Sequence, residues 1–504
     1  MKKLHTILLF LVSISITYAQ SGTLDPTFGT NGIVTTVISG TFNFSAGTVV
    51  QSDGKIVVAG YAGEPSSYKA AVARYNTDGT LDTSYGNAGT LIIPVGANKS
   101  YATDVALQDD GKIVLGARTW DNVSGNFAVI RLNIDGTLDT SFGTGGLTIA
   151  SNGNDVAETV AIQDDGKIVL GGYTDDDFST ARFNTDGTLD TSFGTNGWSI
   201  TEFDTSLSFI KEIGIQDDGK IVLAGFIVNS KYQMAAARIN ADGTIDNTFG
   251  TNGKVFFNVG PDNDFLEGMA IQADGKILLG GHSYVSSPPL KYDMAIVRLN
   301  IDGSFDTSYG NNGVSTARIV DGANYTRRMT IQADGKALLV GFTVVGTEYN
   351  IGMARFDTDG NLDASFGTNG MVSTDINGRE DYGNAIAIQP DGKIIIAGNS
   401  YTSTGTGEIV VVRYDNGTLG KNDNAVLNNQ IIGFYNSNSN TFNLQSENNI
   451  IEGVTIYNMT GQLVETFKND ATIFSTNVSE YATGVYLVTI NSGNQTSHMR
   501  FIKS

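Results

Sequence analysis

A repeat with a period near 57 residues fills most of this 504-residue chain and restricts what the chain can fold into. Two motifs alternate along it, Q-x-D-G-K and D-G-x-L-D-x-x-F/Y-G-x-x-G with occasional substitutions, and each occurs seven times. The glutamines are Gln51, Gln108, Gln163, Gln216, Gln272, Gln332 and Gln389. The second aspartates are Asp25, Asp82, Asp139, Asp190, Asp246, Asp306 and Asp363. Short β-branched runs with Asp-Gly or Gly punctuation at such a period are typical of a propeller or another solenoid of strands.

Each period contains four strand candidates, and we find no segment with helical periodicity of more than two turns. The first candidate ends at the glutamine, as in residues 159–163, and an Asp-Gly turn suited to a two-residue hairpin leads to the second, as in residues 167–172. The third carries an arginine, as in residues 234–240, and the Leu-Asp loop leads to a fourth, as in residues 254–259. The arginines are Arg74, Arg131, Arg182, Arg238, Arg298, Arg355 and Arg413.

The two ends of the repeat region predict a closed ring. The chain begins with the loop motif at Leu24 and a fourth-type strand, Ile33 to Ile38, whereas Ile409 to Tyr414 is a third-type strand whose next loop fails at Gly420. These orphan strands complement each other if the N-terminal strand completes the last blade, and closure hides the exposed sheet edges. We therefore predict an all-β fold, a seven-bladed β-propeller of four-stranded blades closed by the N-terminal strand.

Two stretches of the repeat carry a family resemblance. Asp135 to Gly143 (DGTLDTSFG) and Gln163 to Leu170 (QDDGKIVL) resemble the delta-60 repeat, a propeller-forming repeat of secreted bacterial proteins. The resemblance covers about residues 22–419. It implies an architecture, without a common activity or a catalytic set.

The N-terminus has the features of a secretory signal peptide. Lys2 and Lys3 precede an apolar run, Ile7 to Ile16, which is followed by Thr17, Tyr18 and Ala19. The run is about half of the roughly 20 residues that a bilayer span needs. We expect a signal peptide at residues 1–19, a propeller at residues 20–419, and no transmembrane helix in the mature protein.

The C-terminal part differs from the repeats in its composition and in its pattern of strands. Residues 420–430 are polar and predict a linker, and residues 431–504 predict a separate small β-sandwich. Within it, Val454 to Asn458 and Gly461 to Val464 predict a hairpin, and a further strand follows at Gly484 to Val488 before the basic end of the chain.

This C-terminal module is similar to the type A sorting domain of the type IX secretion system. One departure is that Asn436 to Asn440 replaces the usual Pro-Asn-Pro-like opening. The resemblance implies a Gram-negative bacterium, recognition by an outer-membrane translocon, removal by a sortase-like peptidase, and either release or attachment to the outer membrane. A β-sandwich binding module is the alternative.

Charge and composition exclude several classes of function. The chain has 31 basic and 52 acidic residues, a net charge of −21, so nucleic acid is not an expected partner. It has no cysteine, which excludes disulfides, thiolate metal sites and a cysteine nucleophile. Of three histidines, His5 lies in the leader and His498 in the sorting module. The remaining one, His282, is expected to be an ordinary loop residue, and no histidine cluster for zinc is expected.

The acids that recur in every repeat predict structural roles. We expect the repeated aspartates to accept hydrogen bonds from backbone N–H groups in turns, and each repeated arginine to pair with an aspartate of its own blade. Asn76, Asp78 and Asp82 also offer hard oxygens for Ca²⁺, but their spacing lacks the full D-x-[DN]-x-[DN]-G run and its distal glutamate. We therefore expect turns here, and no cofactor or metal, with Ca²⁺ as the weaker alternative.

Residues that do not repeat gather in loops on one predicted face, where the second strand of each blade leads to the third. Variation confined to one face of a repeat protein is typical of a binding face. The loops are Ala62 to Lys69, Arg118 to Asn126, Thr174 to Phe178, Ile227 to Gln233, Ser283 to Asp293, Thr343 to Asn350 and Ser400 to Gly407. The candidate binding residues are Tyr68, Trp120, Asp175, Asp176, Asp177, Tyr232, Tyr284, Tyr292, Tyr349 and Tyr401.

Two functions fit these observations. The first is a non-catalytic, secreted or cell-surface binding or adhesion protein that engages a glycan or a protein, because flat amphipathic rings suit both. The second is a carbohydrate-active enzyme, a hydrolase or lyase, with acids and tyrosines near the central channel. The sequence shows no cluster of non-repeated His, Lys or carboxylate residues. We therefore favour the first function and assign no catalytic residue.

Overall fold

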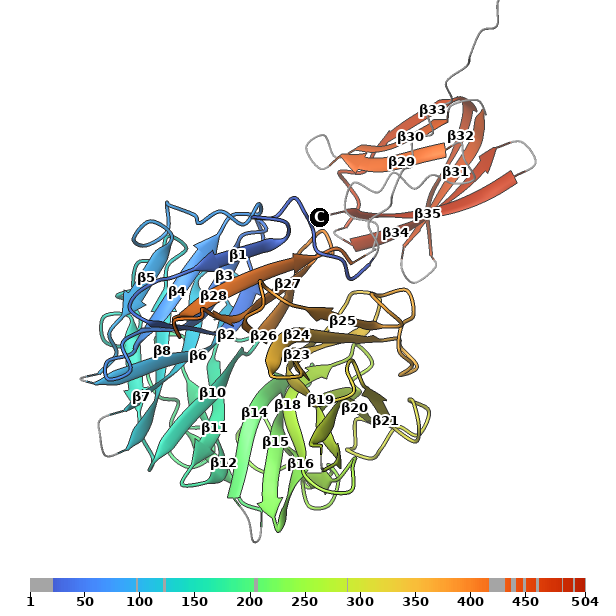
Figure 1. Ribbon diagram of the computed structural model, residues 1–504. Coiled ribbons are helices and arrows are strands. Elements are labelled where there is room, and N and C mark those ends of the chain that lie inside the picture. The colour runs from blue at the N-terminus through green and yellow to red at the C-terminus, as the bar shows by residue number, and fades with distance from the viewer. Residues whose placement is uncertain are drawn as a thin grey trace, which may run out of the picture. The chain divides into compact units, whose positions relative to one another are not determined.

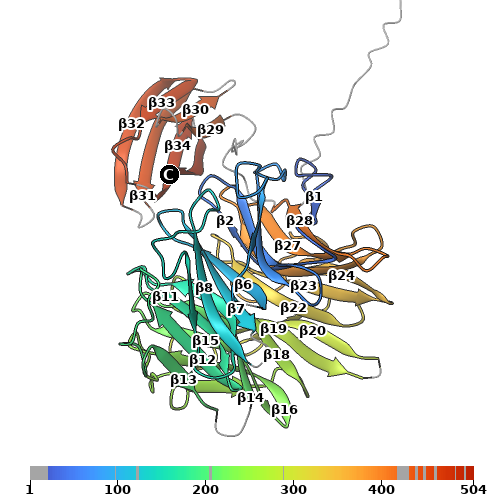
Figure 2. The same ribbon diagram turned by 90° about the vertical axis from the view of Figure 1, so that its left-hand side faces the viewer.

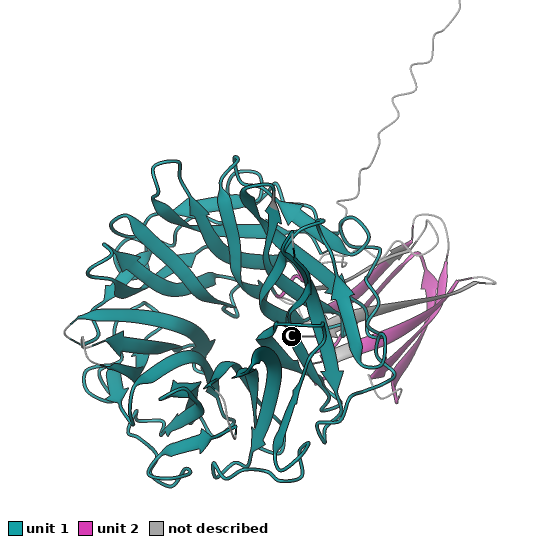
Figure 3. Cartoon of the chain, turned by 60° about the horizontal axis from the view of Figure 1, so that its bottom comes forward, with its two compact units in different colours: residues 1–389, 393–417 teal, residues 390–392, 418–504 magenta. Residues whose placement is uncertain are grey.

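The protein, represented by a computed structural model, consists of strands in its described parts. These are residues 21–96, 98–120, 124–203, 207–287, 289–416, 431–436, 441–446, 450–458, 462–482, 484–492 and 495–503, and they contain no helix that could span a membrane. The predicted signal peptide and linker lie outside these ranges. The chain divides into two compact units, residues 1–389 with 393–417 and residues 390–392 with 418–504 (Figure 3).

The first unit is built from seven four-stranded antiparallel sheets, here called blades 1 to 7. Blade 1 contains β2 (Phe42–Val50), β3 (Ile56–Gly63), β4 (Lys69–Tyr75) and β5 (Thr90–Ile93); blade 2 β6 (Lys99–Leu107), β7 (Ile113–Trp120), β8 (Gly125–Leu132) and β9 (Leu147–Ala150); blade 3 β10 (Asp155–Ile162), β11 (Ile168–Thr174), β12 (Asp177–Phe183) and β13 (Trp198–Thr201); and blade 4 β14 (Leu207–Ile215), β15 (Ile221–Asn229), β16 (Lys231–Ile239) and β17 (Lys254–Phe257). Blade 5 contains β18 (Asp264–Ile271), β19 (Ile277–Ser286), β20 (Lys291–Leu299) and β21 (Val314–Ala317); blade 6 β22 (Asn324–Ile331), β23 (Ala337–Val345), β24 (Glu348–Phe356) and β25 (Met371–Thr374); and blade 7 β26 (Glu380–Ile388), β27 (Ile394–Tyr401), β28 (Gly407–Tyr414) and β1 (Ile33–Thr36).

The N-terminal strand completes the last blade, as the sequence predicts. β1 pairs antiparallel with β28, with Ile33 opposite Val412 and Thr36 opposite Ile409 (Figure 1). The strand ends at Thr36, two residues earlier than expected, because the side-chain carbonyl of Asn43 accepts the N–H groups of Ile38 and Ser39 at 2.8 and 2.9 Å. The first strand of each blade packs against the first strand of the next, including β26 against β2, so the ring is closed.

The hydrophobic core lies between neighbouring blades. The second strands carry nearly continuous apolar runs, and in β3 the residues from Ile56 to Gly60 are all buried. Both faces of these strands are covered, which explains why they do not alternate with polar residues. At the ring closure, Ile56 and Tyr75 of blade 1 belong to the same buried cluster as Ile395 and Val411 of blade 7. The neighbouring strands β6, β7 and β8 of blade 2 can be followed in Figure 2.

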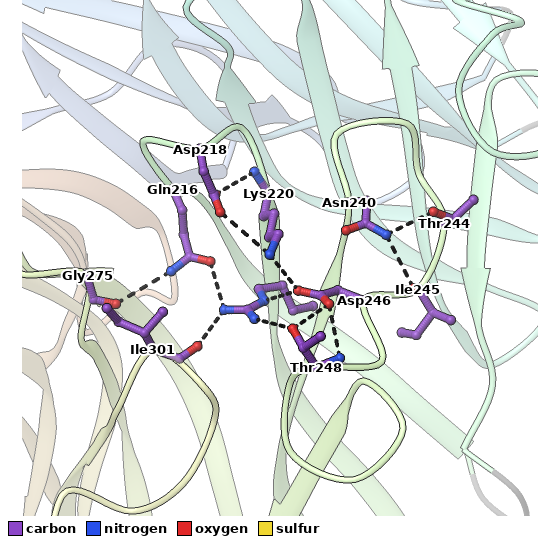
Figure 4. A network of polar contacts seen from close by, with 11 residues as sticks. Gln216, Asp218, Lys220, Asn240, Thr244, Ile245, Asp246, Thr248, Gly275 and Ile301 are labelled. Carbon is purple, nitrogen blue, oxygen red and sulfur yellow. Dashed lines mark hydrogen bonds and ion pairs between the residues drawn. The ribbon is translucent and has the colours of Figure 1, made fainter.

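The repeated arginine of each blade stands at the centre of a polar network, shown for blade 4 in Figure 4. The Nε atom of Arg238 lies 2.7 Å from Asp246, whose Oδ2 also lies 3.1 Å from Lys220. The guanidinium donates to the carbonyl of Ile301 in blade 5 at 2.5 Å and lies over the ring of Phe249 at 4.9 Å. Each network therefore joins one blade to the next.

The same pairing recurs around the ring and confirms the predicted arginine–aspartate pairs. The pairs are Arg74–Asp82, Arg131–Asp139, Arg182–Asp190, Arg238–Asp246, Arg298–Asp306, Arg355–Asp363 and, across the closure, Arg413–Asp25, at 2.7 to 2.9 Å.

The predicted turn role of the aspartates is also confirmed. Asp82 Oδ1 accepts from the backbone and hydroxyl of Ser84 at 3.1 and 2.6 Å, and Asp78 accepts from Thr80 in the same way. The carboxylates of Asp78 and Asp82 are thus engaged in turns and an ion pair, and Asn76 donates through its Nδ2 to the hydroxyl of Thr80 at 3.0 Å.

The second unit is a small β-sandwich. One sheet contains β29 (Ile431–Asn436), β30 (Thr441–Ser446) and β33 (Ile473–Asn477), and the other β32 (Leu463–Ala471), β31 (Ile451–Asn458), β34 (Gly484–Ser492) and β35 (Gln495–Lys503). The predicted hairpin is confirmed by the pairing of β31 with β32. The core between the sheets includes Phe442, Val454, Ile456 and Val488.

Asp25 is expected to be critical for stability, because it holds the two chain ends of the ring together. Asp25→Ala leaves Arg413 and Lys393 without their shared carboxylate, and we expect it to lower the free energy of unfolding by about 3–5 kcal/mol. Asp53→Ala is the control, since Asp53 is 56% exposed, lies 3.7 Å from Lys55 Nζ and accepts one hydrogen bond from the N–H of Lys55 at 3.1 Å, contacts worth about 1 kcal/mol together. Urea unfolding measures the free energy of unfolding of both variants. Equal losses in the two variants would contradict a closing role for Asp25.

Candidate functional site

The first strands of the seven blades place one set of side chains at a common height in the ring. The residue seven positions before each repeated glutamine pairs with a residue on the second strand of the same blade. The pairs are Phe44–Tyr61, Tyr101–Arg118, Val156–Tyr173, Phe209–Phe226, Phe265–His282, Tyr325–Phe342 and Tyr382–Asn399. Eleven of the fourteen are aromatic, and we call this set the aromatic belt. It lies at the ends of the strands that meet the variable loops, because the first strand starts there and the second ends there.

Rings of the belt contact one another across blade boundaries. Tyr61 lies 4.9 Å from Tyr101 of the next blade, and Phe342 lies 5.0 Å from Tyr382. A continuous run of ring contacts leads from Tyr173 through blades 4, 5 and 6 to blade 7. Residues that are about one repeat apart in sequence therefore lie side by side in neighbouring blades and form one shared surface.

Five of the six predicted tyrosines contact rings of this belt, and Tyr284 reaches it through Tyr292. Tyr68 contacts Tyr61 and Tyr101 at 5.2 and 5.9 Å, and Tyr232 contacts Phe265 at 4.6 Å. The remaining four make similar contacts: Tyr284 with Tyr292, Tyr292 with Tyr325, Tyr349 with Tyr382, and Tyr401 with Tyr382.

Five of these tyrosines lie on strands, and their assignment to loops was wrong. They are Tyr232 of β16, Tyr284 of β19, Tyr292 of β20, Tyr349 of β24 and Tyr401 at the end of β27. The strands extend further than their apolar runs suggest, because cross-strand pairs such as Tyr284–Tyr292 continue the ladder beyond the buried core. Tyr292 is only 9% exposed, so it supports the belt more than it offers a surface.

The predicted acidic run forms a tight turn in blade 3. Asp175 and Asp176 are exposed and have positive φ angles of 47° and 71°, and Asp177 begins β12. Burial raises the pKa of Asp177, with the neighbouring charge of Glu202 acting in the same direction. Trp120, at the end of β7, is 40% exposed and lines a cavity described below.

His282 is a buried belt residue, so the expectation of an ordinary loop residue was wrong. It lies on β19, is 6% exposed, and stacks on Phe265 at 5.0 Å. Burial lowers its pKa to about 3, and the charge of Arg327 acts in the same direction. The imidazole is therefore neutral at physiological pH.

Charged side chains follow the belt along the first strands. Each first strand has a β-bulge five residues before the repeated glutamine, which lets two consecutive residues oppose one. The bulge residues and their successors include Asp104, Glu158, Thr159, Lys211, Glu212, Glu267, Arg327 and Arg328, which we call the axial cluster.

Contacts within the axial cluster extend over several blades. Arg328 Nε of blade 6 lies 3.8 Å from Glu212 Oε2 of blade 4, so these side chains meet inside the ring and not between adjacent blades. Lys211 lies 3.3 Å from Glu158. The hydroxyl of Thr159 lies 2.7 Å from Glu212 and 3.1 Å from Asp104. The hydroxyl has one proton and can donate to only one of these two carboxylates at a time. A proton on the other carboxyl lets that group donate to the hydroxyl oxygen in turn.

Burial shifts the protonation of this cluster. It raises the pKa of Glu212 to about 7, and Asp104 adds to the rise while Arg328 opposes it. Burial also raises the pKa values of Asp104 and Glu267. A carboxyl that titrates near neutrality is a common feature of catalytic sites and also of structural charge networks.

The axial cluster corrects the expectation that no group of non-repeated ionisable residues exists. It was missed because its members lie in five different repeats, each within an unremarkable strand. The sequence does contain a signal of the axial cluster. When the repeats are aligned on their glutamines, the residues four and five positions before the glutamine differ in charge from blade to blade. Catalysis is therefore not excluded by a lack of such residues.

The fold and the comparisons agree on the class of protein. A family profile described as a domain of unknown function (DUF5122) beta-propeller matches residues 51–85, 108–142, 163–193, 216–249, 272–309, 332–366 and 389–419. A second, described as a secretion system C-terminal sorting domain, matches residues 434–504. The protein is a seven-bladed β-propeller. Its propeller is built of DUF5122 repeats, and its type IX sorting domain marks it for export and cell-surface attachment.

Solved structures add only a general likeness. The polysaccharide lyase Uly1 is 11% identical with a TM-score of 0.44, covering 74% of this chain and 90% of its own. Sqt1 of Chaetomium thermophilum is 11% identical with a TM-score of 0.39, covering 76% and 98%. Drosophila Plexin A, solved with Semaphorin 1b, is 9% identical with a TM-score of 0.39, covering 78% and 88%. No curated protein matches the chain. These likenesses carry no conclusion about function.

Glu212 is expected to make the folded protein less stable as the pH rises from about 5 to 8. Its pKa is raised from 4.5 to about 7, so in this range the folded state keeps a proton that the unfolded state has lost. The stability falls by up to about 3 kcal/mol over this window. Glu212→Gln should reduce this fall in stability. The part of the fall that remains is expected to come from Asp104, whose pKa is also raised. Urea midpoints measured against pH test this, with the exposed Glu348→Gln as control. An unchanged profile in Glu212→Gln would contradict the assignment.

Proposed function

We propose that this protein is a non-catalytic binding or adhesion protein that acts outside a Gram-negative cell and engages a glycan or a protein through the face that carries the aromatic belt. The sorting domain supports export through the type IX machinery. Removal of that domain by a sortase-like peptidase, and the choice between release and attachment to the outer membrane, are parts of this proposal.

The observation that carries the proposal is the gathering of the non-repeated aromatic residues on one face. Rings such as Tyr68, Tyr349 and Tyr401 are half-buried, so each is held in place by its neighbours and still offers an edge or a face to solvent. Tyrosine gives a large rigid contact area at a small cost in conformational entropy. Such rings stack on sugars, and we therefore favour a glycan over a protein.

The binding face is tested with Tyr349→Ala/Tyr401→Ala. We expect this variant to lose at least about tenfold in affinity for the ligand found on a glycan and protein array, since loss of one good aromatic contact costs more than about 1 kcal/mol. Phe256→Ala is the matched control, because Phe256 is 53% exposed but lies on the fourth strand β17, outside the belt. Retained affinity in the tyrosine variant, or equal loss in the control, would contradict the proposal.

The axial cluster favours a second candidate, a carbohydrate-active enzyme. Glu212, with its pKa near 7, lies close to Arg328 and in the same cluster as Lys211, which is a set of groups able to exchange protons and hold an anion. Release of new chain ends from a polysaccharide panel, lost in Glu212→Gln and in Lys211→Met but kept in Asp176→Asn, would establish this function at the cluster. Loss in Asp176→Asn would place the chemistry on the variable face instead.

A further inference from the structure

One cavity in the propeller is lined by residues of blades 2 and 3. Its volume is about 280 Å³, which is near the lower end of about 300–1,000 Å³ for ligand pockets. The exposed ring of Trp120 forms part of the wall. The lining residues are Lys99, Tyr101, Arg118, Thr119, Trp120, Gly125, Asp155 and Val156.

Strand pairing brings two cations and two aromatic rings together at this cavity. On β6 and β7, Lys99 is opposite Trp120 and Tyr101 is opposite Arg118. Side chains alternate along a strand and opposite residues share a face, so these four side chains stand on the same face of the pair. The guanidinium of Arg118 lies over the ring of Tyr101 at 4.8 Å.

The two cations at this cavity have no acidic partner in the part of the chain that the structure describes. Among the described residues, no carboxylate oxygen lies within 4.0 Å of Lys99 or Arg118, although the chain has 52 acids for 31 bases. The Nε of Arg118 is buried and has no hydrogen-bond partner in the described part of the chain. All seven repeated arginines, by contrast, have an aspartate within 2.9 Å. A buried donor left without a partner costs stability, which points to a missing acceptor.

Asp155, an acid in the lining of the cavity, forms no ion pair with either cation and instead uses its oxygens to hold a loop. Its Oδ1 accepts from the hydroxyl of Thr174 at 2.7 Å, and its Oδ2 accepts from the N–H of Asn152 at 2.8 Å. The corresponding residues of blades 1 and 5, Asn43 and Asp264, hold the preceding loop in the same way. Asp155 therefore holds a loop, and with two cations to one carboxylate the described lining of the cavity keeps a net positive charge.

We propose that this cavity binds an acidic sugar residue of a glycan, with its carboxylate or sulfate ester on Arg118 and Lys99 and its ring against Trp120. This inference rests on the proposed glycan-binding function. A guanidinium suits a planar or tetrahedral oxyanion, and an aromatic ring suits the apolar face of a sugar. The net charge of −21 repels densely charged polymers, so the cavity suits a glycan with isolated acidic residues.

The test compares matched oligosaccharides on xylan, mannan and galactan backbones by calorimetry at physiological salt. Each backbone is used with one uronate, with that uronate reduced to the neutral sugar, and with one sulfate ester. We expect at least about tenfold tighter binding of an acidic form than of its neutral counterpart. Tighter binding of the uronate form assigns a carboxylate as the anion, and tighter binding of the sulfated form assigns a sulfate ester.

Variants locate the binding. Lys99→Gln should weaken the acidic form about tenfold and leave the neutral form unchanged, whereas Trp120→Ala should weaken both. Lys254→Gln is the matched control: Lys254 Nζ lies 5.5 Å from the ring of Phe203, much as Lys99 Nζ lies 5.4 Å from Tyr68, but Lys254 is outside the cavity. Arg118→Lys keeps the positive charge but removes the planar guanidinium. Its affinity for the acidic form should fall between those of the wild type and Lys99→Gln.

Equal binding of acidic and neutral forms, or an unaffected Lys99→Gln, overturns this inference. If affinity then still depends on Tyr349 and Tyr401, the proposed function stands without the acidic subsite. Absence of binding to every oligosaccharide overturns the inference as well, and binding of a protein ligand in the array would then leave the wider function intact.

Discussion

The buried ion pair between each repeated arginine and aspartate is the interaction on which the ring depends. A buried charge is tolerated when it is paired and hydrogen-bonded, and here each guanidinium contacts a carboxylate of its own blade, an aromatic ring, and a carbonyl of the following blade. In blade 7 the aspartate is Asp25, which comes from the other end of the chain. Burial alone would raise the pKa of Asp25, but bonds from Lys393 and Thr27 and the charge of Arg413 hold it at about 2. The pair therefore stays ionised at neutral pH.

Because these networks and the turns use the repeated residues, the non-repeated residues are left for other roles. They collect in two places, the aromatic belt near the variable loops and the axial cluster further along the same first strands. The belt offers a surface, whereas most charges of the axial cluster neutralise one another within the ring. This division is why we assign ligand binding to the belt and the adjoining cavity, and why Glu212 is the residue to test for chemistry.

Much of the candidate site could be foreseen, but not its arrangement. The sequence picked out Trp120 and six tyrosines because they interrupt a repeat, and ring contacts do unite those tyrosines. It missed Phe265, since an aromatic residue within a strand looks like core, and it placed His282 in a loop although this residue lies on β19. It also missed the pairing of Lys99 with Trp120, because which residues lie opposite each other depends on the register between two strands.

The sequence by itself determined the number of blades, the closing strand and the sorting module, because these follow from motif spacing and from the count of strands at each end. The repeated pairs were also readable, since each arginine and its aspartate lie only eight residues apart in six of the blades. Only the tertiary structure decided which non-repeated residues meet. Arg328 and Glu212 are more than a hundred residues apart, and their contact exists because the ring closes around a common axis. The packing of blade 2 against blade 3 likewise places Lys99 and Arg118 beside a cavity where the described acid, Asp155, forms no ion pair with either of them.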